Sequence, residues 1–213
     1  MFLATASSLS DEELAAPSLC EGWTRAHVIA HVASSGRALV GLIDWATSGK
    51  ERPLYASPEA RFEAIAAIAA LPREELLAEV RDSAATFADE AQRLTGELAA
   101  PEVKVAGREL PATSIVALRI AEMVVHHHDL ETAWTIEEAD PDSLLNALEA
   151  VVRAMRAKGA PGMTLVTEER DEWVIGDGAL RVESDREGLL KWLARGDAAE
   201  LEAAGPVPVL PSW

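Results

Sequence analysis

Glu122 and His126 are the two residues of this sequence whose types and spacing best suit metal binding. Each residue turns an α-helix by about 100°, so residues four apart lie within about 40° of each other. The two side chains would therefore lean toward one point, and a carboxylate and an imidazole are both good zinc ligands. His127 and His128 would point about 140° and 120° away from Glu122, in opposite directions, so neither could join the same site.

A third ligand would have to come from another helix, and two upstream histidines are candidates. His27 and His31 also stand four residues apart, in a stretch whose apolar residues recur at helical spacing. His31 lies in the apolar stripe with Val28 and Val32, which predicts that it faces the interior. His27 lies nearer the helix start and is expected to be capped or solvated. Three protein ligands would leave one position open for water or a sulfur substrate, as in catalytic zinc sites.

Two simpler interpretations of these residues stay open. A glutamate and a histidine at this spacing are common as a surface ion pair. The histidine run would also suit an exposed helix end, where a positive imidazole interacts favourably with the helix dipole. Burial is favoured instead by the apolar neighbours Ile120, Met123, Val124 and Val125. A buried glutamate needs a partner for its charge, and a metal ion is one of the few adequate ones.

Two further residues could support such a site. Asp129 follows the histidine run directly. It could orient a ligand through a hydrogen bond, or it could cap or pack the helix, and both interpretations remain open. Cys20 has no basic residue beside it in the sequence, so we expect a small packing residue rather than a nucleophile.

The composition limits the classes of partner. Of the 213 residues, 49% are hydrophobic and 26% charged, which suits a normally packed core. The formal net charge of −17 opposes binding to nucleic acid and to anionic membranes, so neither is an expected partner. A single cysteine excludes a disulfide framework within the chain. The start does not resemble a signal peptide, and no apolar run approaches the roughly 20 residues of a membrane span, so a cytoplasmic protein is expected.

The candidate ligands must be positioned by a bundle of helices. Apolar residues at helical spacing, with start signals at Thr24 and at Ser57-Pro58, predict five helices in the first part of the chain. They span about residues 25–47, 58–70, 72–94, 111–135 and 141–158. Residues 96–112 are expected to form a loop with a short extended piece.

The sequence changes character after residue 158. Gly159 to Gly162 has the composition of a linker. Three short β-like runs follow, MTLVTE, EWVIG and ALRVES, and then a closing helix over 187–195 and an irregular tail. We therefore predict a mainly α protein, with a four-helix-type bundle at 1–158 and a small α+β domain at 159–213.

Six motifs of the chain recur together in one known family. They are GWTRAHVIAHVASSGRALVGLIDWATSG, PLYASPEAR, GRELPAT, RIAEMVVHHHDL, WLARGD and PVPVLPSW. With them, the chain resembles the mycothiol-dependent maleylpyruvate isomerases, which belong to the DinB-like metal-binding helical bundles. Relatives usually begin earlier, with most of the first bundle helix. Here that helix is expected to be very short, or the bundle to be completed differently.

The resemblance implies a metal site and thiol chemistry. It implies that zinc, or another divalent metal, is bound by His31, Glu122 and His126, the set that helix geometry favours. It also implies that Arg195, in the small C-terminal domain, contributes to the active site by holding a substrate carboxylate. The Gly-Arg pair usual in the family is Ala194-Arg195 in this chain.

The implied reaction converts maleylpyruvate to fumarylpyruvate, a step in gentisate degradation. The thiolate of mycothiol would add to the cis double bond, allow rotation and leave again. Zinc would lower the pKa of that thiol or stabilise the enolate, and the sequence leaves both roles open. Two alternatives remain: another mycothiol-dependent enzyme such as an S-transferase, and a non-catalytic metal- or ligand-binding regulatory module. The oligomeric state stays open.

Overall fold

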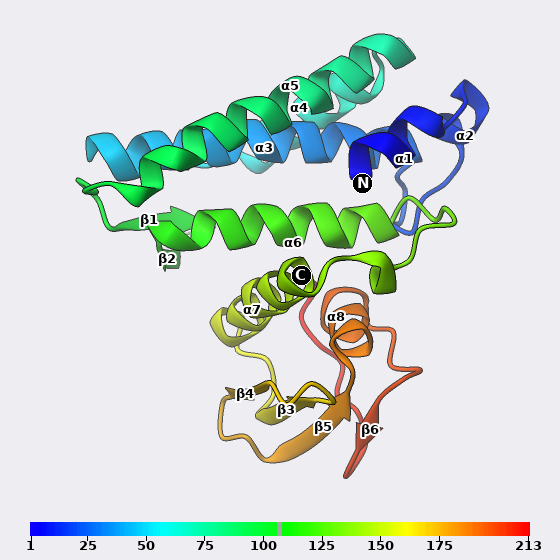
Figure 1. Ribbon diagram of the computed structural model, residues 1–213, viewed down its shortest axis with the longest axis vertical. Helices are drawn as coiled ribbons and strands as arrows, with labels where there is room; N and C mark the ends of the chain where they lie inside the picture. Colours follow the sequence, from blue (N-terminus) through cyan, green and yellow to red (C-terminus); the bar gives the residue numbers. More distant parts are fainter. Residues whose placement is uncertain (106–107) are drawn as a thin grey trace. The chain divides into compact units, whose positions relative to one another are not determined.

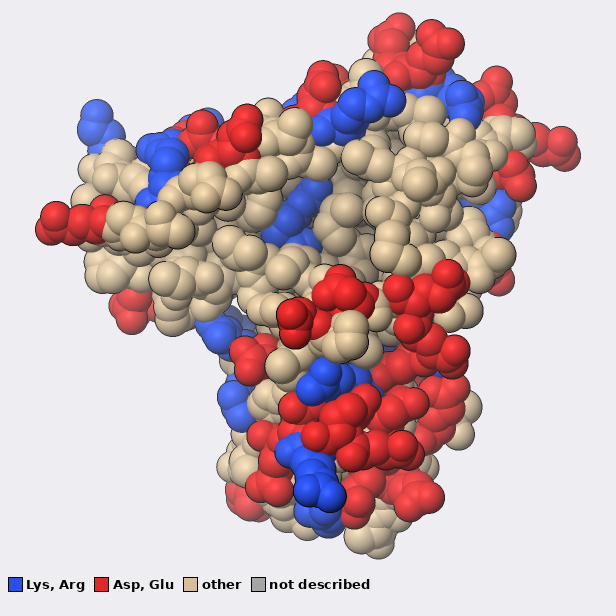
Figure 2. All heavy atoms as spheres, in the orientation of Figure 1, with Lys and Arg blue, Asp and Glu red and all other residues tan. Residues whose placement is uncertain are grey.

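The computed structural model describes residues 1–105 and 108–213 of the chain. The first residue of the motif GRELPAT and part of the loop predicted at 96–112 lie outside the described residues. The chain is mainly α and divides into two compact units, Met1–Trp134 and Thr135–Trp213 (Figure 1). On the face shown in Figure 2, carboxylates crowd the surface of the second unit, in keeping with the net charge of −17.

The first unit is built around one central helix, α3 (Arg25–Ser48). It packs against α4 (Pro58–Ala69), α5 (Arg73–Ala91) and α6 (Ile115–His128) (Figure 1). The helix starts agree with the sequence prediction, because Thr24 and Ser57 each accept a hydrogen bond from the first turn of the helix that follows.

The front of the chain forms two short helices, α1 (Phe2–Ser8) and α2 (Asp11–Ala15), in agreement with the expected short first helix. Two other parts of the first unit differ from the prediction. The predicted loop contains a hairpin of two antiparallel strands, β1 (Glu102–Val105) and β2 (Arg108–Pro111). Helix α6 ends at His128 rather than near residue 135. Glu131 has a positive φ of 50°, a conformation that a helix cannot continue through.

Two apolar clusters fill the first unit, one around each half of α3. The amino-terminal cluster includes Phe2, Leu14, Val28, Ile29, Val32, Leu76, Val80 and Leu130. The carboxy-terminal cluster includes Leu39, Leu42, Ile43, Phe87, Val103 and Ile115. Between them on α3 lie Ser34, Ser35 and Gly36, which are buried without being large apolar residues. These three residues, called the polar layer below, interrupt the core about one turn after His31.

Helix α3 is both long and apolar. Among the helices that the structure describes, it alone is long and apolar enough to cross a membrane. However, 72% of its most apolar window is buried inside the protein. A helix covered by neighbours on several sides has this composition for packing reasons.

The second unit packs two helices on a four-stranded sheet. Its elements are α7 (Pro141–Ala157), β3 (Met163–Thr167), β4 (Glu172–Ile175), β5 (Leu180–Ser184), α8 (Arg186–Arg195) and β6 (Glu202–Ala203). The strand order is β4-β3-β5-β6, with β3 and β5 parallel and the outer strands antiparallel to their neighbours. Three strands and the closing helix agree with the prediction. The strand β6 was missed because two residues are too few to show a periodic pattern.

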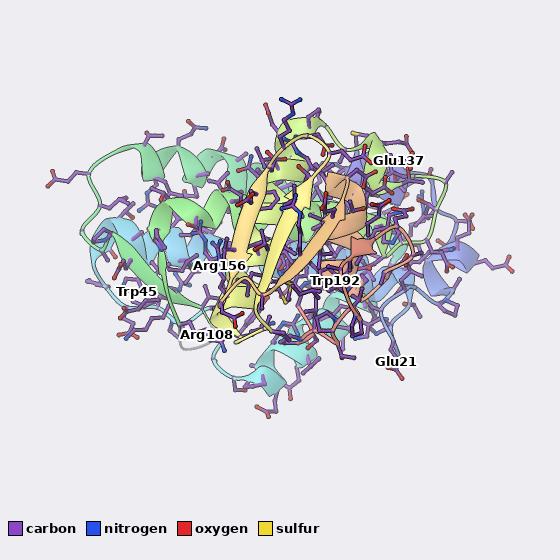
Figure 3. The ribbon with its side chains drawn as sticks, turned by 90° about the horizontal axis from the view of Figure 1, so that it is seen from below. Glu21, Trp45, Arg108, Glu137, Arg156 and Trp192 are labelled. Atoms are coloured by element: carbon purple, nitrogen blue, oxygen red, sulfur yellow. The ribbon has the colours of Figure 1, made fainter. Side chains whose placement is uncertain are left out.

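Helix α7 belongs to the second unit. It contacts α8 and β4, and Arg156 on this helix donates a hydrogen bond to the carbonyl of Val174 at 2.8 Å (Figure 3). The division between the units therefore falls after Trp134, whereas the sequence prediction placed it after residue 158. The Gly159–Gly162 segment belongs to the short connection from α7 to β3 within the second unit, with Gly159 at a φ of 69°.

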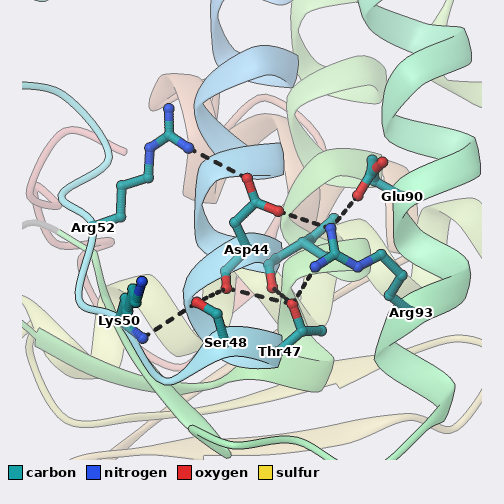
Figure 4. A network of polar contacts seen from close by, with 8 residues as sticks. Asp44, Thr47, Ser48, Lys50, Arg52, Glu90 and Arg93 are labelled. Atoms are coloured by element: carbon teal, nitrogen blue, oxygen red, sulfur yellow. Dashed lines mark hydrogen bonds and ion pairs between the residues drawn. The ribbon is translucent and has the colours of Figure 1, made fainter.

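A polar network joins the carboxy-terminal ends of α3 and α5. Arg93, which follows α5, donates to Asp44 of α3 at 2.7 Å and also contacts Glu90 (Figure 4). Arg52 donates to the other oxygen of Asp44 at 3.3 Å. These side chains are largely exposed to solvent, so their ion pairs contribute little to stability.

Candidate metal centre

His31, Glu122 and His126 meet between α3 and α6. The Oε2 atom of Glu122 accepts a hydrogen bond from Nε2 of His31 at 2.8 Å and lies 3.4 Å from Nε2 of His126. The centroids of the two imidazole rings are 4.5 Å apart, and the ring planes cross at 82°. One potential ligand atom from each residue lies within 4.8 Å of the other two. The structure thus brings the three predicted ligands, called the triad below, to one point.

The second ring nitrogen of His126 is held by Asp129. Nδ1 of His126 donates to Oδ2 of Asp129 at 2.7 Å, and the carboxylate is fully buried at 0% exposure. The thiol of Cys20 donates to the same oxygen at 3.3 Å. Metal-binding histidines commonly donate their second N–H to a carboxylate, which leaves Nε2 with its lone pair. Of the two interpretations open for Asp129, this contact favours orientation of a ligand.

Cys20 has two roles in the structure. Its side chain packs against the amino-terminal cluster, as expected, and it also donates to Asp129. Cys20, His126 and Asp129 form a second group whose ligand atoms lie within 4.8 Å of one another. His126 is common to both groups, and its Nδ1 already donates to Asp129, so its Nε2 faces the triad.

The second ring nitrogen of His31 faces Arg61 of α4. Nη2 of Arg61 lies 3.4 Å from Nδ1 of His31, while Nε2 of His31 donates to Glu122. A guanidinium can only donate, so His31 carries its proton on Nε2 in this arrangement. Metal ligation through Nε2 would move that proton to Nδ1. Arg61 would then lose its contact with the ring and become available to another acceptor.

Burial and mutual charge set the protonation of the triad. Burial raises the pKa of Glu122, but the electrostatic interaction with His31 and the hydrogen bonds from both histidines outweigh it and hold the pKa well below its ordinary value. Burial lowers the pKa of His126, but its hydrogen bonds, above all that to Asp129, raise the pKa well above the ordinary value. For His31, burial prevails over the effect of Glu122, and the pKa is lowered. An ionised carboxylate thus lies between the two imidazoles at neutral pH.

The other three histidines lie outside the triad. His127 stacks on Trp134 with ring centroids 3.7 Å apart, and its Nε2 lies 2.7 Å from the hydroxyl of Thr5. His27 lies at the start of α3 with Nδ1 2.8 Å from the hydroxyl of Thr24, a capped position as predicted. Within the described residues, His27, His127 and His128 belong to no potential metal-binding group.

Arg195 is the last residue of α8, in the second unit. Its guanidinium carbon lies 5.9 Å from the ring centroid of Trp213, and Nη1 donates to the carbonyl of Ala194 at 2.7 Å. The side chain is half-buried. Its role toward a substrate carboxylate stays a prediction.

Three residues near the triad were not singled out from the sequence: Tyr55, Arg61 and Arg119. Arg119 lies on α6 one turn before Glu122 and is only 5% exposed. Burial lowers its pKa, against the opposing charge of Glu122. A positive charge among the apolar residues of α6 was the available signal for Arg119. Tyr55 and Arg61 carried no signal beyond their place in the PLYASPEAR motif.

Comparisons with known proteins identify the family of the chain. The family described as "Mycothiol maleylpyruvate isomerase N-terminal domain" matches residues 1–131. A crystal structure of the mycothiol-dependent maleylpyruvate isomerase is 32% identical, with a TM-score of 0.82 over 100% of this chain and 91% of that chain. The crystal structure of a histidine-to-alanine mutant of the mycothiol-dependent maleylpyruvate isomerase is also 32% identical, with a TM-score of 0.81 and the same coverage. No curated protein matches the sequence.

Proposed function

The chain belongs to the mycothiol maleylpyruvate isomerase family, and we propose that it is a mycothiol-dependent cis–trans isomerase that converts maleylpyruvate to fumarylpyruvate in gentisate degradation. The observation that carries this proposal is the meeting of Glu122 with His31 and His126. All three lie in the segment that the family matches. A metal-binding centre of this kind would assist thiol chemistry on an activated alkene by lowering the pKa of the thiol or by stabilising the enolate.

The donor set of the triad fits zinc. Two imidazole nitrogens and one carboxylate oxygen are usual zinc ligands, and three protein ligands leave one position open. Asp129 supplies the outer hydrogen bond that such sites usually have. The side chain of Glu122 is 18% exposed, which leaves a way in from solvent. Zinc held there would act as a Lewis acid and lower the pKa of a thiol, and mycothiol would supply that thiol.

The side chains around the triad would hold it in a fixed geometry. Asp129 keeps a proton on Nδ1 of His126 and so directs Nε2 toward Glu122. His31 and His126 are 4% and 7% exposed, so little water reaches their rings. Exclusion of water strengthens the electrostatic interactions of the site. Arg195 would hold a substrate carboxylate, as the family pattern implies.

The proposal is tested by following maleylpyruvate absorbance with and without mycothiol, on protein whose zinc content has been measured. Turnover should require mycothiol and leave its concentration unchanged. Consumption of mycothiol in proportion to substrate would indicate an S-transferase instead. Metal binding without any thiol-dependent turnover would indicate a non-catalytic module. Either result would refute the isomerase.

Substitutions test the metal ligands separately from the reaction. His31→Ala, Glu122→Ala and His126→Ala should each remove most of the metal and the activity. His27→Ala is the matched control, because it lies on the same helix one turn away and contacts Thr24 instead. Full metal content in all three ligand variants would show that the triad does not hold the metal. Elemental analysis of the purified protein identifies which metal is bound.

A further inference from the structure

The polar layer in the core of the first unit has a counterpart on α6. Arg119 reaches across to α3, where its Nη1 donates to the carbonyl of Val32 at 2.7 Å and to the hydroxyl of Ser35 at 3.1 Å. Val32 follows His31 directly in the sequence, and Arg119 lies one turn before Glu122. The guanidinium therefore lies next to the triad. Its partner Val32 adjoins His31 on α3, and Arg119 itself lies one turn from Glu122 on α6.

Arg119 is a buried cation without a carboxylate partner. It is 5% exposed, and no carboxylate of the described residues lies within ion-pair distance of it. Its Nη2 has no hydrogen-bond partner in the part of the chain that the structure describes. Burial of an unpaired charge is costly. An N–H group left free in this position therefore points to an anionic ligand.

A second buried donor lies close by on Tyr55, in the segment before α4. Its buried hydroxyl makes no hydrogen bond of normal geometry among the described residues, although Ser34 and Arg61 lie close enough to act on its pKa. The guanidinium carbon of Arg61 lies 5.8 Å from the centroid of the Tyr55 ring. Nη2 of Arg61 also lies 3.4 Å from Nδ1 of His31, and His31 precedes Val32, whose carbonyl accepts from Arg119. Tyr55, Arg61 and Arg119 therefore all lie near His31. Burial raises the pKa of the Tyr55 hydroxyl, so it keeps its proton and can donate at neutral pH.

We propose that Nη2 of Arg119 and the hydroxyl of Tyr55 bind one carboxylate of the substrate, with Arg61 as a second nearby cation. A guanidinium N–H and a phenol O–H are both donors, and a carboxylate is an acceptor only. The proposal rests on the proposed function, since it takes the substrate to be a dicarboxylate. In a chain of net charge −17, these cations offset the repulsion that a dianion would meet.

The test uses maleate as a simple dicarboxylate probe, titrated calorimetrically into zinc-loaded, full-length protein without mycothiol. Tyr55→Phe removes only a hydroxyl and keeps the ring, so it should leave the fold and the zinc content unchanged while weakening maleate binding about 10-fold. Arg119→Lys keeps a donor for the Val32 carbonyl but loses Nη2. It should weaken binding by about 10- to 100-fold.

Two further variants keep the test informative. Gly36→Ala would place a Cβ atom 3.1 to 3.3 Å from the guanidinium atoms of Arg119. It should displace that group and weaken maleate binding even if Arg119→Lys fails to fold. Arg37→Lys is the matched control, because Arg37 pairs with Glu79 on the exposed side of α3; it should bind maleate like the wild type.

The outcomes test the carboxylate site separately from the proposed isomerase reaction. Unchanged maleate affinity in both Tyr55→Phe and Gly36→Ala, at full zinc content, would overturn the inference, and so would absence of maleate binding by the wild type. Maleate binding that depends on Arg119 in a protein without isomerase activity would support the carboxylate site and refute only the proposed reaction.

Discussion

Replacement of Asp129 by asparagine tests whether the metal centre depends on the orientation of His126. The asparagine side chain has nearly the same shape and can still offer an oxygen to Nδ1 of His126, now 2.7 Å from the carboxylate. It removes the negative charge that makes this hydrogen bond strong and that also accepts from the Cys20 thiol. The ring keeps its place but loses the partner that fixes its tautomer.

The expected size of the effect follows from the burial of this contact. Outer hydrogen-bond partners of metal ligands are typically worth about 10- to 100-fold in metal affinity. Because Asp129 is 0% exposed, solvent cannot replace the lost charge, and we expect a loss near the middle of that range. A loss of about 30-fold corresponds to about 2 kcal/mol of binding free energy.

The measurement is a competition for zinc between the protein and a chromophoric chelator at pH 7.5. The control is Asp140→Asn, which removes only the charge of an exposed N-cap residue in the second unit and should not change zinc affinity. Thermal unfolding of both variants establishes that they are folded. Zinc affinity of Asp129→Asn within about two-fold of the wild type, in a folded protein, would show that the Asp129 contact does not support a metal site.

Three other substitutions have defined outcomes. His127→Ala should keep zinc but destabilise the protein by about 2–4 kcal/mol, because it removes a buried ring stacked on Trp134; loss of zinc would contradict the separation of His127 from the triad. Leu42→Ala, in the carboxy-terminal cluster, should cost about 2–5 kcal/mol in chemical denaturation with zinc affinity unchanged. Arg186 holds the pKa of Asp171 below its ordinary value, so Asp171 stabilises the fold above about pH 3.9 and loses this contribution as the pH falls through the lower, folded-state pKa. Asp171→Asn should therefore be less stable by about 1 kcal/mol at pH 7, and a difference that did not shrink on acidification would argue against this ion pair.

The triad could be predicted because its geometry is mostly local. The spacing of Glu122 and His126 places them on one face of any helix, and the apolar neighbours of His31 turn it inward. The contacts of Arg119 and Tyr55 could not be predicted in the same way. They depend on which turn of α3 faces α6 and on the course of the segment before α4. Both are set by tertiary packing, which leaves no periodic mark on the sequence.

The ends of the helices show the same difference between local signals and tertiary packing. The start of α3 follows from Thr24, a local cap, and agrees with the prediction. The end of α6 depends on a positive φ at Glu131, a residue type that rarely adopts it, so nothing in the sequence marks that position. The placement of α7 with the second unit depends on its contacts with α8 and β4, which are again tertiary.

The location of the whole triad within Met1–Trp134 has a consequence for how ligands protect the protein. A bound ligand stabilises only the part of a chain whose unfolding releases it. Zinc held by the triad would therefore raise the melting temperature of the first unit rather than that of the second. When the metal site is saturated, the melting temperature of the protein would be limited by the smaller, second unit. Substitutions meant to raise that temperature would therefore begin in α7, α8 and their sheet.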